Sequence, residues 1–274
     1  MTITIRPIQT GCVRIKEAQR HRRGGLPGVL IDKAWTEWLP IYAWVIMHPE
    51  GVILVDTGET ARTAEPGYFP RWHPYYRLAV QMDVAPEQEI GPQLRRLGIA
   101  PDDVRTVVMT HLHTDHAGGL HHFPNSQLLV SGDEHRAAQG VSGKIAGYLP
   151  QHWPTWFAPE PITFQPVTVG PFQQSMPVTT ASDVIIVPTP GHTPHHVSVI
   201  VRGDGVDYFL AGDTSYTEKA LMDRQPDGVS PKAQTAVATM DAILTYSRAT
   251  PTVYLPSHDP ASAARLGRQQ TIPT

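Results

Sequence analysis

Four short apolar runs in this chain each end within a few residues of a histidine or an aspartate. These pairs are residues 107–109 with His111, 185–187 with His192, 208–210 with Asp213, and 253–255 with His258. Apolar runs of this length predict buried β-strands. Side chains at strand ends rest on a rigid scaffold, while the loops that carry them can vary in shape. The sequence therefore predicts a β-scaffold that presents polar side chains at its strand ends.

The remaining elements read from the sequence are a mixture of strands and helices. Runs at 41–47 and 52–55 flank the turn signal 48–51 and predict a hairpin, and further strands are expected at 104–109, 127–130 and 197–201. Helices are expected at 86–97, 133–139 and 232–246, the first ending before Gly98. The pattern predicts a mixed α/β fold, and it does not by itself choose between a doubly wound sheet and a layered sandwich.

Composition limits the domain number and the partners. With 274 residues, 41% of them hydrophobic, the chain can bury a large core, and we expect one domain over 1–274 with irregular excursions around 60–86 and 140–166. The net charge is -3, and the basic cluster at 20–23 is short, so no nucleic-acid partner is expected. Cys12 is the single cysteine, and no apolar stretch reaches a membrane span, so we expect a soluble cytoplasmic protein without membrane contact.

The densest cluster of candidate ligands follows the first of the four runs. His111, His113, Asp115 and His116 lie within six residues of one another, in a chain with 14 histidines. Alternate side chains of an extended segment share a face, so His111 and His113 can reach one metal ion together. Asp115 and His116 straddle a turn and can reach a second ion. The competing interpretation is a solvent-exposed histidine-rich loop.

This order of ligands resembles the metallo-β-lactamase superfamily. The shared features are the His-x-His-x-Asp-His motif, then a lone histidine, an aspartate and a final histidine, together with the motif Val55-Asp56-Thr57-Gly58. The resemblance covers residues 41–258. It implies an αββα sandwich with two metal ions at one edge of the two sheets.

The resemblance also assigns the ligands. It implies that one ion is held by His111, His113 and His192, that the other is held by Asp115, His116 and His258, and that Asp213 bridges both. Asp56 is expected to support a ligand histidine rather than bind metal. Imidazole and carboxylate ligands without thiolate favour Zn²⁺, and Mn²⁺, Co²⁺ or Fe²⁺ also suit them.

Three features point to one branch of the superfamily. Cys12 lies far from every motif, few residues follow His258, and Tyr216 stands three residues after Asp213. The arrangement resembles the quorum-quenching N-acyl homoserine lactonases. It implies that a hydroxide held between the metals opens the lactone ring of a small acylated substrate, with Tyr216 and Asp115 as catalytic residues. A homodimer is one assembly that the sequence leaves open.

Other functions stay open on the same scaffold. They are a different lactonase such as a pyridoxolactonase-like enzyme, a phosphotriesterase, a β-lactamase, a ligand-binding domain with structural metals, and a redox diiron protein. We expect an apolar cleft for the acyl chain among the aromatic residues of the irregular segments. These are Trp35, Trp38, Tyr42, Phe69, Trp72, Trp153 and Trp156. His121 and His122 are interpreted as surface or loop residues.

Overall fold

The first of two sheets in this computed structural model, which describes residues 3–273, has the strand order β4-β1-β2-β3-β5-β6-β7. β1 pairs antiparallel with β2 and β4, β2 pairs antiparallel with β3, and β3, β5, β6 and β7 run parallel. The bounds are β1 Thr4–Ile15, β2 Leu39–His48, β3 Gly51–Val55, β4 Val80–Asp83, β5 Val104–Val108, β6 Gln127–Val130 and β7 Glu160–Pro161. His48 lies opposite Gly51, so the predicted hairpin is present.

The second sheet has the order β12-β11-β10-β9-β8. Its strands pair antiparallel except for β11 and β12, which run parallel. The bounds are β8 Met176–Pro177, β9 Val184–Pro188, β10 Val197–Arg202, β11 Asp207–Gly212 and β12 Thr252–Pro256. The polar residues that follow β5, β9, β11 and β12 therefore come from both sheets.

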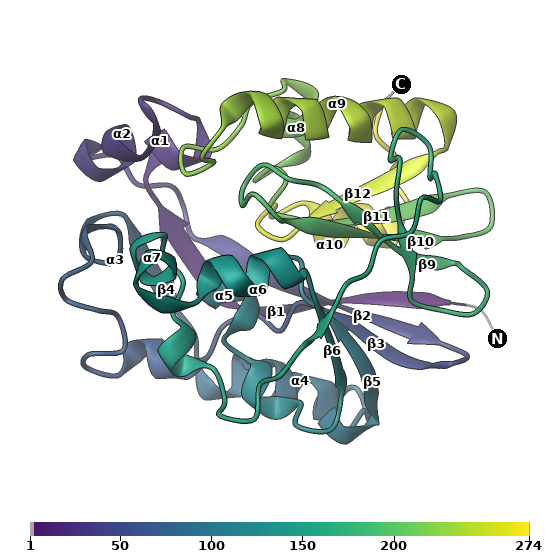
Figure 1. Ribbon diagram of the computed structural model, residues 1–274, viewed down its shortest axis with the longest axis horizontal. Coiled ribbons are helices and arrows are strands. Elements are labelled where there is room, and N and C mark those ends of the chain that lie inside the picture. The colour runs from purple at the N-terminus through teal and green to yellow at the C-terminus, as the bar shows by residue number, and fades with distance from the viewer. Residues whose placement is uncertain (1–2, 274) are drawn as a thin grey trace.

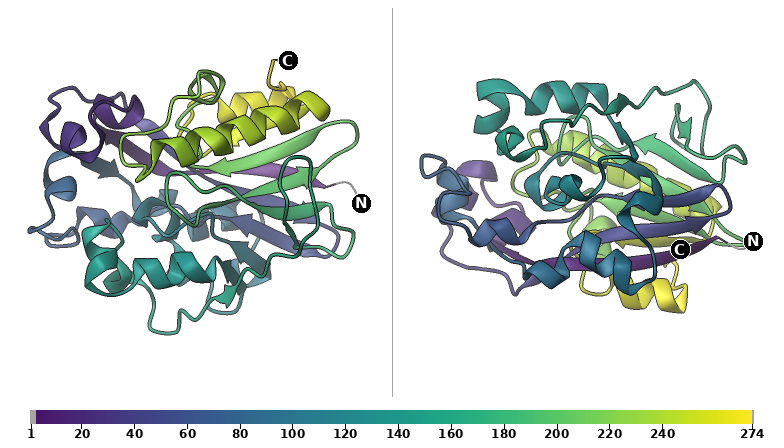
Figure 2. Two further views of the ribbon diagram at one scale, coloured as in Figure 1. Left: turned by 45° about the horizontal axis from the view of Figure 1, so that its top comes forward. Right: turned by 90° about the horizontal axis from the view of Figure 1, so that it is seen from below.

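Helices cover the outer face of each sheet (Figure 1). The α-helices are α1 Glu17–Arg20, α2 Gly25–Ile31, α3 Pro74–Leu78, α4 Ile90–Arg96, α5 Thr114–Ala117, α6 Gly132–Ala138, α7 Gly140–Ile145, α8 Glu218–Met222, α9 Ala233–Ala249 and α10 Ser262–Arg268. The 3₁₀ helices are η1 Ala61–Ala64, η2 Pro86–Gln88, η3 Pro101–Asp103, η4 Leu120–His122 and η5 Pro150–His152. In Figure 1, α8 and α9 lie above the second sheet and α4 lies below the first, and Figure 2 shows this arrangement from two other sides.

The layers follow from strands that are apolar on both faces. Along β2, Ala43 and Val45 pack toward the helical layer, while Trp44 and Ile46 pack between the sheets. A strand buried on both faces has to lie between two other layers. The structure is therefore an αββα sandwich, as the resemblance implied, and the doubly wound alternative is excluded. Within the described residues, no helix combines the length and the apolar character needed to cross a bilayer.

The predicted helix at 86–97 is interrupted. The structure has η2 and then α4, separated by Glu89, whose backbone is extended. The Glu89 carboxylate accepts hydrogen bonds from the Thr60 hydroxyl and the Ala61 N–H at 2.9 and 2.8 Å. Contacts distant in sequence thus override the helical periodicity.

The end of β11 has no room for a side chain. Gly212 has a φ of +54°, and a Cβ there would lie 2.5 Å from His196 Nε2 and 2.8 Å from Thr110 Oγ1.

Gly205 also has a positive φ, but a Cβ there would meet no atom within 4 Å. Alanine at Gly205 should lower the free energy of unfolding by about 1–3 kcal/mol through backbone strain alone. Alanine at Gly212 should lower it further because of crowding, as measured by urea unfolding. Equal losses would contradict this account.

Candidate metal centre

All seven predicted ligands gather where strand ends of the two sheets meet. His111, His113, Asp115 and His116 follow β5, and the other three follow strands of the second sheet. Three overlapping groups have ligand atoms within 4.8 Å of one another. They are His111 with His113 and His192, His111 with His116 and Asp213, and Asp115 with His116 and His258. The set expected to hold one ion and the set expected to hold the other therefore lie side by side.

Asp213 lies between the two sets. Its Oδ2 is 3.5 Å from His192 Nε2 and 3.3 Å from His258 Nε2, and its Oδ1 is 3.3 Å from His116 Nε2. In the first set, His113 Nδ1 is 3.1 Å from His111 Nε2 and 3.0 Å from His192 Nε2. One carboxylate is thus placed to reach an ion on either side.

The donor atoms fit divalent metal ions. His116 Nε2 and Asp213 Oδ1 are buried and make no hydrogen bond within residues 3–273. A buried polar atom without a partner is destabilising by about 1–3 kcal/mol, and a bound cation removes that penalty. Nitrogen and oxygen ligands in two adjoining groups suit a pair of Zn²⁺, Mn²⁺, Co²⁺ or Fe²⁺ ions.

The second ring nitrogen of three ligand histidines is held by a protein acceptor. His116 Nδ1 lies 2.8 Å from Asp56 Oδ2, His192 Nδ1 lies 3.0 Å from Asp227 Oδ2, and His258 Nδ1 lies 2.8 Å from the Pro40 carbonyl oxygen. Such partners accept the Nδ1 proton, so Nε2 keeps its lone pair for a metal. The rings are therefore held in metal-binding orientation before any ion arrives.

Burial and neighbouring charges set the pKa values of the candidate ligands. Burial lowers the pKa of His113 to about 3, with a contribution from His192, so His113 is neutral and can donate a lone pair. Burial alone would raise the pKa of the Asp115 carboxyl, but His258 and His116 lower it to about 2. Burial would lower the pKa of His258, but neighbouring carboxylates raise it to about 10. Since neutral imidazole and ionised carboxylate are the forms that bind metal, an ion that binds His258 displaces a proton.

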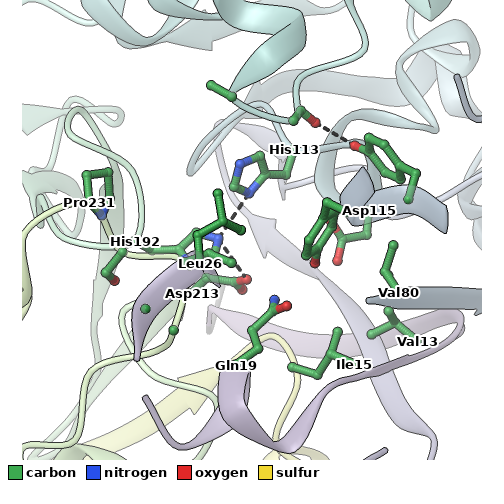
Figure 3. A pocket seen from close by; sticks show the side chains of 18 of the residues that line it. Val13, Ile15, Gln19, Leu26, Val80, His113, Asp115, His192, Asp213 and Pro231 are labelled. Atoms are coloured by element: carbon green, nitrogen blue, oxygen red, sulfur yellow. Dashed lines mark hydrogen bonds and ion pairs between the residues drawn. The ribbon is translucent and has the colours of Figure 1, made fainter. Parts of the chain in front are cut away.

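A cavity of about 510 Å³ opens beside this cluster (Figure 3). Its polar end contains His113, Asp115, His192, Asp213, Tyr216 and His258. Its apolar wall is lined by residues of four segments, Val13, Ile15, Leu26, Pro27, Tyr75, Tyr76, Val80 and Met82. Predicted catalytic and metal-binding residues thus face one hollow that also has an apolar wall.

The prediction that seven aromatic residues line the apolar cleft is wrong. None of the seven predicted aromatic residues is among the described residues that line this cavity. Trp35 covers the Lys16 ammonium, at 3.6 Å from the ring centroid, Trp38 stacks on Arg14, and Tyr42 packs between the sheets. Phe69 stacks on Tyr76, Trp153 packs under the first sheet, and Trp72 and Trp156 are exposed. Aliphatic residues of β1, α2 and β4 line the cavity instead, together with Tyr75 and Tyr76 of α3.

Two polar residues at the site carry no motif in the sequence. Asp227 lies in the loop after α8, and Gln19 lies in α1, where its Nε2 donates to the Tyr216 hydroxyl at 2.7 Å. Neither residue follows an apolar strand or forms a spacing pattern with other ligands. Their isolated positions in the chain gave no signal that could have found them.

The whole ligand series lies within one family match. Residues 36–258 match the sequence model of the metallo-beta-lactamase superfamily, which is more than half of the chain. The chain belongs to this superfamily. The match ends at His258, the last of the seven predicted ligands.

The relatives of this superfamily member include lactonases. An N-acyl homoserine lactonase of Bacillus sp is 29% identical over 203 residues, 73% of this chain and 71% of the relative. The N-acyl homoserine lactonase AttM of Rhizobium radiobacter is 26% identical over 239 residues, 83% of this chain and 85% of the relative. A solved N-acyl homoserine lactone hydrolase with N-hexanoyl-L-homoserine bound at its catalytic metal center has a TM-score of 0.77, with 22% identity and 95% of each chain covered. That likeness shows a shared fold.

The contact between Asp227 and His192 predicts a metal-affinity phenotype. Asn at Asp227 removes the charge that orients His192, so metal affinity should fall about 10–100-fold. Asp183 pairs with His48 at 3.2 Å outside the candidate metal cluster and offers a matched control. Chelator competition should show the loss in Asp227→Asn and not in Asp183→Asn. An equal effect of both variants would count against the role of Asp227.

A buried glutamate beside the superfamily's Asp56 motif predicts a pH effect on stability. Burial, with a contribution from Asp115, raises the pKa of Glu59 from 4.5 to about 8. Between these values the folded protein binds a proton that the unfolded chain releases, so stability falls as pH rises. Glu59→Gln removes this titration. The free energy of unfolding of Glu59→Gln minus that of the wild type should increase from pH 5 to pH 8. A difference that does not change with pH would contradict the assignment.

Proposed function

We propose that this protein opens the lactone ring of N-acyl homoserine lactones by hydrolysis at a centre of two divalent ions, with Zn²⁺ the first choice. The observation that carries the proposal is Tyr216, which lines the cavity together with five of the seven candidate ligands. The lactonases among the relatives support the same substrate class. The cavity combines a polar end for the ring with an apolar wall for an acyl chain.

The proposed ligand assignment keeps the two sets described above. His111, His113 and His192 hold one ion, Asp115, His116 and His258 hold the other, and Asp213 contacts both. When bound, the ions would polarise the carbonyl and lower the pKa of a water molecule. The histidine anchors at Asp56, Asp227 and Pro40 keep this set preorganised.

The proposed role of Tyr216 is to donate a hydrogen bond to the substrate oxygen. Its hydroxyl accepts a hydrogen bond from Gln19, and its own proton meets no acceptor within residues 3–273. Burial raises its pKa well above the usual value, with a contribution from Asp213, so the hydroxyl stays protonated. The proton is therefore free for the negative charge that develops on the carbonyl oxygen.

Asp115 is the proposed proton carrier for the leaving alkoxide. It lines the cavity, and its side chain is 15% exposed whereas that of Asp213 is 4% exposed. As an ionised carboxylate, it would first take up the proton that the attacking water gives up. Transfer of that proton to the ring oxygen completes the ring-opened hydroxy acid.

A substrate panel tests the proposed function. The purified protein, loaded with Zn²⁺, is assayed with short-chain and long-chain N-acyl homoserine lactones, a simple γ-lactone, a phosphotriester and a β-lactam. Turnover should be fastest with the acylated lactones, because only they fill both the polar end and the apolar wall. Efficient turnover of the β-lactam or the phosphotriester with inert lactones would reject the proposal.

Tyr216→Phe removes one hydroxyl from the polar end of the cavity. Loss of such a hydrogen-bond donor should lower kcat by about 10²–10³-fold with metal content unchanged. Tyr254 offers the control, because its buried hydroxyl contacts Thr214 and Ser215 rather than the cavity. Tyr254→Phe should lower stability and leave most of kcat intact. An unchanged rate in Tyr216→Phe would remove Tyr216 from the mechanism.

A further inference from the structure

A fourth group of metal-ligand side chains lies outside the candidate centre. Glu89, His121 and His122 have ligand atoms within 4.8 Å of one another. The two histidines belong to η4, the turn that follows α5, and Glu89 lies between η2 and α4. The side chains of Glu89 and His122 are 13% and 15% exposed, and that of His121 is 44% exposed. The group is therefore fixed on the protein and open to solvent on one side.

One oxygen of the Glu89 carboxylate is held by hydrogen bonds, and the other oxygen faces the two histidines. Oε1 accepts the hydrogen bonds from Thr60 and Ala61 described above. Oε2 lies 2.9 Å from His122 Nε2 and 3.4 Å from His121 Nε2. Two imidazole nitrogens and one carboxylate oxygen thus point at a common position.

The hydrogen bonding of His121 leaves two acceptors face to face. Its Nδ1 lies 3.2 Å from the Gly118 carbonyl oxygen, which can only accept, so Nδ1 carries the ring proton. In neutral His121, Nε2 then presents a lone pair to the Glu89 carboxylate, which is also an acceptor. Two acceptors at 3.4 Å repel each other, and a cation between them turns the repulsion into coordination.

Close packing keeps the second histidine in place. A Cβ on Gly91 would lie 2.5 Å from His122 Nδ1, so the ring can approach α4 only because residue 91 is glycine. The ring centroids of His121 and His122 are 4.0 Å apart. Burial, with a contribution from His121, lowers the pKa of His122 and so favours its neutral, metal-binding form.

We propose that Glu89, His121 and His122 bind a third divalent transition-metal ion, such as Zn²⁺, Co²⁺ or Ni²⁺. Three protein ligands leave an open position for water, so this ion exchanges more readily than the two at the centre. The ion joins η4, which follows the helix carrying Asp115 and His116, to the start of α4 and the Thr60–Ala61 segment. Its role is to stabilise this corner of the fold, and turnover does not require it.

Metal stoichiometry tests the proposal. The metal-free protein is dialysed to equilibrium against buffered Zn²⁺, and the bound ions are counted by elemental analysis. We expect three ions per wild-type chain and two in His121→Ala and in Glu89→Gln. The glutamine variant retains an oxygen acceptor for Thr60 and Ala61, so it separates loss of metal from loss of local structure. Both variants should keep the wild-type kcat.

His21 offers a matched control. It forms another surface histidine–glutamate pair, with His21 Nε2 3.7 Å from Glu17 Oε2, but belongs to none of the ligand groups described here. His21→Ala should still bind three ions. Two ions in the wild type, or three in His121→Ala, would overturn the proposal. His192→Ala should lose an ion of the centre but keep the one at Glu89, so failure of the two sites can be told apart.

Discussion

Asp56 holds together the two strands on which the metal centre depends. Its carboxylate accepts hydrogen bonds from the Thr110 N–H and hydroxyl, at 2.7 and 2.8 Å, and it also contacts His116 Nδ1. The residue itself has a φ of +60°, a conformation that most side chains avoid. A buried carboxylate is tolerated only when fully hydrogen-bonded, so these contacts fix the ends of β3 and β5 relative to one another. The contacts of Asp56 therefore position the ligands that follow β5.

The candidate ligands could be found from the sequence because each stands at a strand end within a recognisable order of residue types. The layers could be read only with the help of a family resemblance, since apolar runs do not tell which sheet a strand joins. The sequence did not predict Asp227 and Gln19 as residues of the site, because irregular loops and one-turn helices give no periodic signal. Their roles come from contacts with His192 and Tyr216 across long sequence separations.

The cavity lining shows where reasoning from residue type fails. Aromatic residues of irregular segments were expected to line an apolar cleft, but Trp35 and Trp38 cover cationic side chains instead. Tyr42 belongs to a strand and fills the space between the sheets. The apolar wall is built from β1, α2, α3 and β4. Along β1 and β4, alternate residues line the hollow, while Arg14 and Gln81 pair with each other on the opposite face. Whether a residue lines the cavity depends on its position in the fold and not on the size of its side chain.

The contact between His258 Nδ1 and the Pro40 carbonyl joins residues 218 positions apart. The candidate ligands themselves extend from residue 111 to residue 258, and Gln19 reaches Tyr216 from the first helix. During synthesis, a chain shorter than 258 residues lacks part of the ligand set, so a metal ion captured early is held by an incomplete site. Loading of the complete centre therefore has to wait until His258 has been synthesised and has emerged from the ribosome. Completion of the metal centre therefore depends on the folding of β12, which carries His258 at its end.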